Sequence, residues 1–243
     1  MRYQFVDCRY ELGKPWRGRE LYLEGHIPGA AYLDLDADLS SPPSATGGRH
    51  PLPTADGFAR AASRAGIGPG VFVVAYDQGT TGGGARLWWL LRHFGHEDAA
   101  VLDGGIGAWL GPLAAGEEEI EPAAFTPRPR SDDAVEAEEL LGRLGDPSLV
   151  LVDARAPERY RGEVEPIDPV AGHIPGARNW HHAEARTIPR DILEAPEIVV
   201  YCGSGVTACV DLLALARAGR PDAKLYPGSW SDWSSRGLPL ERG

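Results

Sequence analysis

Residues 25–30 read Gly-His-Ile-Pro-Gly-Ala, and residues 172–177 repeat the same six amino acids in the same order. Two further landmarks recur around this hexapeptide in both halves of the chain. An apolar run ending in Asp precedes each copy and an apolar run ending in Tyr follows it, at residues 5–7 and 73–76 in the first half and at 151–153 and 198–201 in the second. Landmarks that recur in a fixed order indicate two homologous domains, because an internal repeat reproduces one folding unit along the chain.

The alternation of short apolar runs with helical patterns predicts the fold class. Runs such as residues 149–152 are apolar on both faces, which is typical of a parallel strand in a sheet covered by helices on both sides. Apolar residues at helical spacing follow, for example over residues 206–218. We therefore predict an α/β protein of two homologous domains, each an open, mainly parallel sheet flanked by helices.

The repeat also sets the expected domain boundaries, with a first domain over residues 1–112 and a second over residues 136–243. Residues 113–135 are rich in Pro, Glu and Ala and lack apolar periodicity, so we expect an extended surface linker. The hexapeptide histidines lie 147 residues apart and the tyrosines 125 apart, so the first domain carries 22 extra residues. Arg49 and His50 belong to this insertion. A solvated loop is the simpler interpretation for both, and a contact with the second domain is the alternative.

The composition excludes several classes of partner. The chain has 243 residues, of which 43% are apolar, and a formal net charge of −11. No segment is basic enough to bind nucleic acid or an anionic membrane. No apolar run could cross a bilayer and no signal peptide is recognisable, so we expect a cytoplasmic protein that binds neither nucleic acid nor membranes. Arginine supplies 22 of the 24 basic residues, so a pocket for an anionic substrate should be built from arginine.

The cysteines point to chemistry at one position. The chain contains Cys8, Cys202 and Cys209, and no Cys-x-x-Cys pair. This pattern excludes a disulfide framework and argues against a zinc site, so neither a metal nor a cofactor is expected. Cys209 lies within a helical pattern, where a buried structural role is the simpler interpretation. Cys202 instead ends a predicted strand and opens a glycine-rich loop.

This loop has the pattern of an anion site. It reads Cys202, Gly203, Ser204, Gly205, Val206, Thr207, and an apolar helix follows. The two glycines let the backbone curl so that successive N–H groups point inward. These groups and the helix dipole favour negative charge at the centre of the loop, and the serine and threonine can add hydroxyl donors. The Cys202 thiol should therefore have a depressed pKa and act as a nucleophile.

The first half offers an internal comparison. Asp77 occupies the position that corresponds to Cys202, directly after residues 73–76. A carboxylate cannot perform thiolate chemistry. We therefore predict that the second domain alone is active.

The hexapeptides, the tandem layout, the Asp77 copy and the cysteine loop together resemble the two-domain rhodanese-like sulfurtransferases over nearly the whole chain. Within this family, Gly-Ser-Gly-Val-Thr after the cysteine is similar to the loop of the 3-mercaptopyruvate sulfurtransferases. Members that use thiosulfate more typically carry charged residues at the two positions occupied here by Gly203 and Ser204. The resemblance implies two rhodanese-like domains, of which the second is catalytic.

The resemblance further implies a ping-pong reaction. Cys202 would take a sulfane sulfur from 3-mercaptopyruvate, a small anionic donor, and become a persulfide while pyruvate leaves. A thiol such as thioredoxin or glutathione, or cyanide, would then accept the sulfur, and no cofactor is implied. A thiosulfate:cyanide sulfurtransferase and a non-catalytic rhodanese-type regulatory module are the alternatives.

The substrate-binding residues follow from the same resemblance. Arg159 matches the family arginine that clamps the substrate carboxylate. The usual second arginine is absent, because Asp168 stands near its position. Arg161 or a residue of the first domain would take its place, or the donor differs.

The resemblance also implies a proton relay formed by Asp7, His26 and Ser204. His26 has a structural alternative, since His173 occupies the same position in the second hexapeptide. A cysteine phosphatase is disfavoured, because that class carries Arg six positions after its cysteine, where this chain has Ala208.

Overall fold

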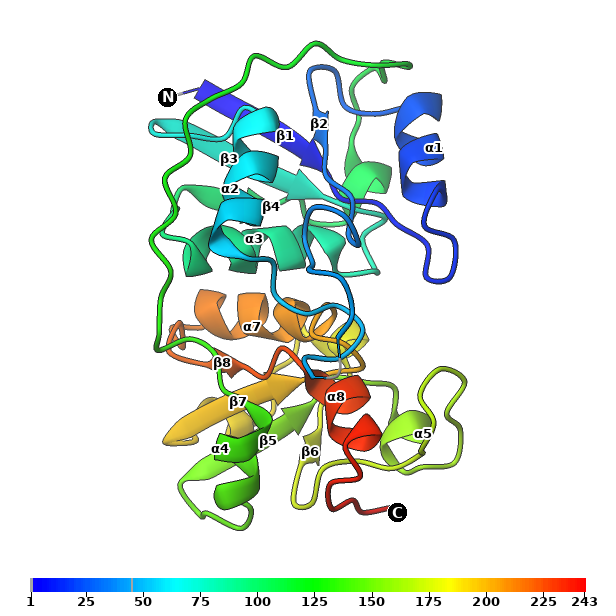
Figure 1. Cartoon of the computed structure of the whole chain (residues 1–243), viewed down its shortest axis with the longest axis vertical. Helices are drawn as coiled ribbons and strands as arrows, with labels where there is room; N and C mark the ends of the chain where they lie inside the picture. Colours follow the sequence, from blue (N-terminus) through cyan, green and yellow to red (C-terminus); the bar gives the residue numbers. More distant parts are fainter. Residues whose placement is uncertain (1, 45) are drawn as a thin grey trace. The chain divides into compact units, whose positions relative to one another are not determined.

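The computed structural model describes residues 2–44 and 46–243, which form two compact units. The first unit contains the chain up to Ser41 together with Leu52–Arg130, and the second contains Pro42–Pro51 together with Ser131–Gly243. Each unit has a four-stranded sheet with helices around it (Figure 1). The two sheets share one strand order, which confirms the predicted α/β fold of two homologous domains.

The first unit is built on four parallel strands. These are β1 (Arg2–Asp7), β2 (Ala31–Tyr32), β3 (Val71–Tyr76) and β4 (Ala99–Val101). They pair in the order β2-β1-β3-β4, and every pairing is parallel. The helices are α1 (Arg17–Glu24), α2 (Ala55–Arg64), α3 (Gly83–His93) and the 3-10 helix η1 (Gly105–Ala108). Helix α3 packs on β3 and β4.

The second unit repeats this plan. Its strands are β5 (Leu149–Asp153), β6 (Arg178–Asn179), β7 (Glu197–Tyr201) and β8 (Lys224–Leu225). They pair in the matching order β6-β5-β7-β8, again in parallel. The helices are α4 (Ala137–Gly142), α5 (Pro157–Tyr160), η2 (His182–Glu184), α6 (Arg190–Leu193), α7 (Ala208–Arg217) and α8 (Ser229–Ser235). Over the described residues, no helix combines the length and apolar character needed to span a membrane.

The carboxyl end of β7 lies at the switch point of the second sheet. Strand β5 pairs with β6 on one side and with β7 on the other, and the last residues of β5 and β7, Asp153 and Tyr201, are register partners. Ligands of open parallel sheets bind at this edge, because connections from neighbouring strands diverge there. Cys202, which follows Tyr201, therefore stands at the position where the fold opens a crevice.

The strand before Cys202 is fixed by packing on both faces. Helix α7 covers one side of the sheet and α4 the other (Figure 1). Val199 and Tyr201 belong to a core cluster with Trp230 and Trp233 of α8, and the intervening Val200 is also fully buried. Burial on both faces explains why β7 is a continuous apolar run rather than an alternating one.

Each copy of the hexapeptide forms the same turn. The Nδ1 atom of His26 lies 2.7 Å from the carbonyl oxygen of Tyr22, and the two rings stack with centroids 4.0 Å apart. His173 does the same with Tyr160, at 2.7 Å and 3.9 Å. The repeated histidine therefore has the same structural contacts in both units.

The units divide the chain differently from the expected boundaries. Residues 113–130 run without helix or strand along the first unit, where Ala114 and His26 exchange two backbone hydrogen bonds of 2.9 Å. The segment Pro42–Pro51, which lies within the first half of the sequence, belongs to the second unit. It lies beside α8 (Figure 1), where the Gly47 N–H donates to the Asp232 carboxylate at 3.0 Å. Side-chain and backbone bonds of this kind leave no periodic signal in a sequence.

Candidate active site

Cys202 is buried at the carboxyl end of β7, with 2% of its surface exposed. The active-site loop, residues 202–207, then turns back so that α7 begins at Ala208. Gly205 makes this turn possible: its φ is +76°, and a Cβ there would lie 2.5 Å from the carbonyl oxygen of Pro227. Glycine alone tolerates both the left-handed φ and this close approach.

The active-site loop stabilises a thiolate. Burial by itself raises the pKa of Cys202, but hydrogen bonds to the sulfur outweigh it. The donors are the Thr207 hydroxyl and the backbone N–H groups of Ser204, Ala208 and Gly205, and their net effect lowers the pKa below its ordinary value. The amino end of a helix favours an anion for the same reason, since its N–H groups point at it. This arrangement fits a nucleophilic cysteine.

The amino end of α8 holds the backbone of the loop. The N–H of Cys202 donates to Ser229 Oγ at 3.1 Å, and the N–H of Trp230 donates to the Cys202 carbonyl oxygen at 3.0 Å. Among the described residues, Ser229 is the one non-glycine residue with a left-handed φ, at +55°. Such strain persists where surrounding contacts fix it. Helix α8 therefore anchors the nucleophile.

Ser204 is hydrogen-bonded to a histidine from the segment Pro42–Pro51. The Nδ1 atom of His50 lies 2.8 Å from Ser204 Oγ. Both residues are buried, with 5% and 7% of their surface exposed. A histidine and a serine in contact beside a thiolate can take up and deliver a proton.

The histidine of the relay implied by the resemblance has its own partners inside the first unit. His26 already binds a backbone carbonyl through Nδ1, and its Nε2 lies 3.3 Å from Glu118 Oε1. Asp7 accepts hydrogen bonds from the Arg9 guanidinium, the shortest at 2.6 Å. These bonds use both ring nitrogens and the carboxylate inside the first unit. Within the second unit, the histidine in contact with the loop serine is His50.

Two arginine side chains approach the residue after the nucleophile. A Cβ at Gly203 would lie 2.9 Å from Nη2 of Arg49 and 3.5 Å from Nη1 of Arg159. Arg159 belongs to α5, whereas Arg49 comes from the segment Pro42–Pro51. A side chain at position 203 would push the Arg49 guanidinium away, so glycine lets both cations reach the loop. Two guanidinium groups can hold a carboxylate next to Cys202.

Two buried acids orient these arginines. Glu165 accepts from Nε of Arg159 at 3.2 Å and from its Nη2 at 2.6 Å. Asp168 bridges the two cations: Oδ2 lies 3.3 Å from Arg159 Nη2, and Oδ1 accepts from Nη1 of Arg49. Within the described part of the chain, the buried Nε of Arg49 has no hydrogen-bond partner. The nitrogens nearest Gly203, Nη2 of Arg49 and Nη1 of Arg159, are not those that donate to the two acids in these hydrogen bonds.

Arg161 lies outside this group. Its guanidinium pairs with Glu163 at 2.7 Å, and 43% of the side chain is exposed. The sequence singled out Arg161 because it follows Arg159 closely, and it gave Arg49 and His50 less weight. The available signal was the insertion that contains them, since the second half has no counterpart of it.

A buried acid lies on the helix that follows the loop. Asp211, in the first turn of α7, is fully buried, and among the described residues neither carboxyl oxygen has a hydrogen-bond partner. Burial, followed by the negative charges of Cys202 and Asp153, raises the pKa of Asp211 well above its ordinary value. The protonated form adds no negative charge against the thiolate.

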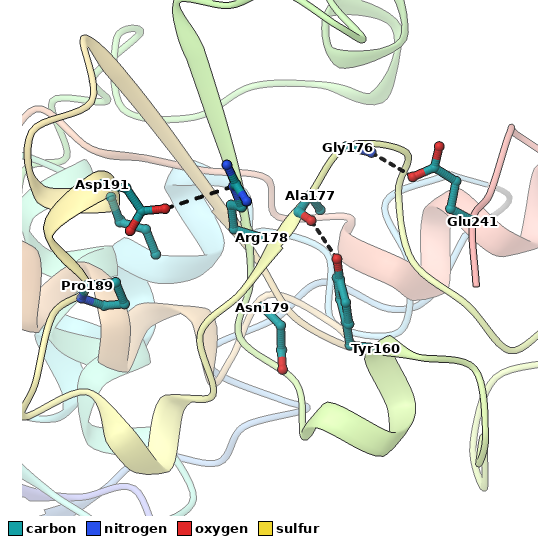
Figure 2. A pocket seen from close by; sticks show the side chains of 9 residues that line it. Tyr160, Gly176, Ala177, Arg178, Asn179, Pro189, Asp191 and Glu241 are labelled. Carbon is teal, nitrogen blue, oxygen red and sulfur yellow. Dashed lines mark hydrogen bonds and ion pairs between the residues drawn. The ribbon is translucent and has the colours of Figure 1, made fainter. Parts of the chain in front are cut away.

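A separate pocket in the second unit is not the reactive centre (Figure 2). It is lined by Tyr160, Gly176, Ala177, Arg178, Asn179, Pro189, Asp191, Ile192 and Glu241. Its polar groups bond to one another: the Gly176 N–H donates to Glu241 at 3.0 Å, and Arg178 lies 3.9 Å from Asp191. No residue of the active-site loop lines it.

Comparisons with known proteins agree with this geometry. The rhodanese-like domain family matches residues 1–111 and 136–236. A probable 3-mercaptopyruvate sulfurtransferase of Pseudomonas aeruginosa is 43% identical over 94% of this chain and 88% of its own length. A putative thiosulfate sulfurtransferase of Mycobacterium tuberculosis is 39% identical over 95% of this chain and 87% of its own length.

A solved structure extends the likeness to the fold. SseA of Escherichia coli, a 3-mercaptopyruvate sulfotransferase, has a TM-score of 0.80 and 34% identity to this chain. The match covers 94% of this chain and 93% of that structure. Matches across both halves, together with the shared sheet order and the cysteine loop, establish the relationship. The chain belongs to the rhodanese family and carries two rhodanese-like domains in tandem.

Proposed function

We propose that this protein is a sulfurtransferase that moves a sulfane sulfur from 3-mercaptopyruvate, through a persulfide on Cys202, to a thiol or cyanide. The observation that carries the proposal is that hydrogen bonds from the loop lower the pKa of Cys202, while two guanidinium groups lie at the adjacent Gly203. Relatives named as 3-mercaptopyruvate sulfurtransferases at 36–43% identity support the donor. Catalysis falls to the second domain, since Asp77 in the first cannot form a persulfide.

Arg49 and Arg159 would bind the carboxylate of the donor. A carboxylate bound by the guanidinium nitrogens near Gly203 would lie one residue from Cys202. Asp168 stands near the position where the family usually has its second arginine. Arg49, which contacts Asp168, would therefore supply the second cation. Mercaptopyruvate separates its carboxylate from its sulfur by two carbons, so a clamp beside the loop leaves the sulfur free to meet Cys202.

The first half-reaction transfers sulfur and releases pyruvate. The Cys202 thiolate attacks the donor sulfur, an S–S bond forms, and the donor C–S bond breaks with its electron pair passing to the enolate of pyruvate. A proton then moves to the enolate carbon, and the persulfide on Cys202 loses one, so that the thiol proton of the donor ends in the methyl group of pyruvate. The loop N–H groups stabilise thiolate and persulfide anions alike.

Ser204 and His50 would carry that proton. Their 2.8 Å hydrogen bond puts an exchangeable hydroxyl next to the reacting atoms, backed by an imidazole whose ordinary pKa lies near neutrality. This pair replaces the relay through Asp7 and His26 that the resemblance implied.

The second half-reaction restores the enzyme. The thiolate of an acceptor such as thioredoxin or glutathione attacks the outer sulfur of the protonated persulfide, and the electron pair of the S–S bond returns to Cys202. Cyanide would form thiocyanate in the same way. The three cysteines are buried thiols outside any disulfide, which favours the reducing cytoplasm as the location.

The donor is tested by loading the reduced protein separately with 3-mercaptopyruvate and with thiosulfate. We expect one added sulfur atom in the intact mass and stoichiometric pyruvate with the first donor, and neither in Cys202→Ser. Loading by thiosulfate alone would make the protein a thiosulfate sulfurtransferase. No loading by either donor would favour a regulatory module.

The relay is tested by a matched pair of histidine variants. His50→Gln should lower kcat for pyruvate release by about 10²-fold while leaving alkylation of Cys202 by iodoacetamide nearly unchanged, because the thiolate donors stay in place. His26→Gln should lower the melting temperature and leave kcat per folded molecule unchanged. A loss of kcat in His26→Gln, with kcat unchanged in His50→Gln, would assign the proton relay to His26 instead.

A further inference from the structure

We infer that Asp168 is a specificity-determining residue, which by bridging Arg49 and Arg159 beside Cys202 makes the site favour a monoanionic sulfur donor over a dianionic one. The inference rests on the proposed function and refines its donor class. It concerns an acid that the chemical steps above leave without a role.

The bridge directs the two guanidinium groups. The Asp168 carboxylate accepts a hydrogen bond from Nη1 of Arg49 and a second one, at 3.3 Å, from Nη2 of Arg159. The nitrogens closest to Gly203 are the other members of each pair, Nη2 of Arg49 and Nη1 of Arg159. Asp168 therefore fixes which donors each arginine turns toward the reacting centre.

The bridge also offsets the positive charge of the two arginines. Glu165 pairs with Arg159, and Asp168 contacts both cations, so each guanidinium charge is met by a carboxylate. The side chains of these acids are only 3% and 4% exposed, so solvent screens these contacts weakly. The site offers directed N–H donors and little excess positive charge.

This balance discriminates between donors. A single carboxylate can accept the available N–H groups, among them the unpartnered Nε of Arg49, as a bidentate ligand. A second negative charge, as on thiosulfate, finds no further cation in the group and lies close to the Cys202 thiolate. Like charges a few ångströms apart in a partly desolvated site repel strongly.

The first test measures kcat/KM for 3-mercaptopyruvate and for thiosulfate in Asp168→Asn. We expect the ratio of the thiosulfate value to the mercaptopyruvate value to rise about tenfold, because one buried negative charge is removed. Asp168→Glu, which keeps the charge, should retain the wild-type ratio. Asp168→Ser is a second neutral variant in case Asn impairs folding.

A matched control comes from the same loop. Glu163→Gln removes an equal charge, but Glu163 is 55% exposed and pairs with the exposed Arg161. Its donor ratio should equal that of the wild type. A ratio that moved equally in both variants would mean that general surface charge, not the bridge, governs donor choice.

The second test does not require sulfur transfer. Alkylation of Cys202 by iodoacetate, a monocarboxylate, is compared with alkylation by the neutral iodoacetamide. We expect the iodoacetate-to-iodoacetamide rate ratio to rise several-fold in Asp168→Asn, to stay constant in Glu163→Gln and to fall in Arg49→Ala.

The outcomes separate the two proposals. Failure of the wild type to load sulfur from either donor overturns the proposed function, and the alkylation ratio then decides the inference alone. Normal loading with unchanged donor and alkylation ratios in Asp168→Asn overturns the inference and leaves the proposed function standing.

Discussion

The loops that follow β3 and β7 occupy equivalent places in two equivalent sheets, and they differ in what fills their centre. In the first unit the carboxylate of Asp77 fills its own loop, accepting the N–H groups of Gly79 at 2.5 Å and of Gly84 at 3.0 Å. In the second unit the loop N–H groups donate to the sulfur of Cys202. The fold thus builds an anion site twice, and the residue at its centre decides whether the site reacts.

The side chains that surround the two loops also differ. The amide of Gln78 donates to the Tyr10 carbonyl at 2.9 Å, and the Tyr10 hydroxyl donates to the Thr81 carbonyl at 2.8 Å, so side chains tie the first loop down. At the second loop, His50 contacts Ser204, and the guanidinium groups of Arg49 and Arg159 lie near Gly203. Duplicating the fold therefore supplies the loop, whereas His50 and Arg49, which the insertion adds, approach only the second copy.

The largest effect is expected from exchanging the central residues. Cys202→Ser should lower sulfur transfer by at least about 10³-fold, because a hydroxyl is a far weaker nucleophile than a thiolate. Adding Asp77→Cys to this variant should restore no transfer, since that loop has no counterpart of His50 or the arginines. Intact mass after donor treatment measures both, and a persulfide formed at position 77 of the double variant would show that the fold alone suffices.

The next effect concerns the thiolate. Thr207→Val removes the hydroxyl donor to Cys202 and should raise the pKa of the thiol. Thiolate is lost as pH falls through the pKa, so the alkylation profile should move to higher pH and the rate at neutral pH should drop by up to about tenfold. Thr207→Ser keeps the hydroxyl and serves as the control. Coincident profiles for all three proteins would contradict the assigned bond.

A smaller effect is expected at the strained residue that holds the nucleophile. Ser229 has φ +55° and accepts the Cys202 N–H, whereas Gly105 in the first unit adopts φ +62° without a side chain. Ser229→Gly relieves the strain and removes the hydroxyl, so we expect little change in melting temperature but a roughly fivefold loss of kcat/KM. Ser229→Ala keeps the strain and should also lose stability. Wild-type transfer by Ser229→Gly would exclude a positioning role for the hydroxyl.

The smallest effect on transfer should come from the inactive loop. Asp77→Asn weakens two buried charge-assisted hydrogen bonds and should destabilise the first unit by about 1–2 kcal/mol. Sulfur transfer per folded molecule should stay at the wild-type level. Chemical denaturation measures the first quantity, with the exposed Asp98→Asn as control. A fall in transfer would give the first loop a part in catalysis.

Much of the architecture could be predicted from local patterns. Apolar runs on both faces marked the parallel strands, and the repeat marked two domains, because strand burial and turn geometry are written into neighbouring residues. The strand and helix around Cys202, the candidate nucleophile, were predictable for the same reason, since the strand, the glycine loop and the helix are contiguous in sequence.

The proximity of His50 to Ser204 and of Arg49 to Gly203, on which the proposed relay and clamp rest, could not be predicted in this way. The repeated hexapeptide drew attention to His26, yet repetition reflected a shared turn, with His173 making the same contact to a tyrosine carbonyl. Arg49 and His50 approach the loop through contacts that span more than a hundred residues of sequence. No spacing rule connects such partners.

The amino-acid sequence is enough to predict the tandem α/β fold, Cys202 as the candidate nucleophile and Asp77 as its counterpart, because each leaves a pattern among neighbouring residues. The folded structure was needed to show that the segment Pro42–Pro51 belongs with the second unit and that Asp168 bridges two arginines there. These placements depend on a few directed polar bonds between residues far apart in sequence, and the geometry of those bonds exists only once the second unit has folded.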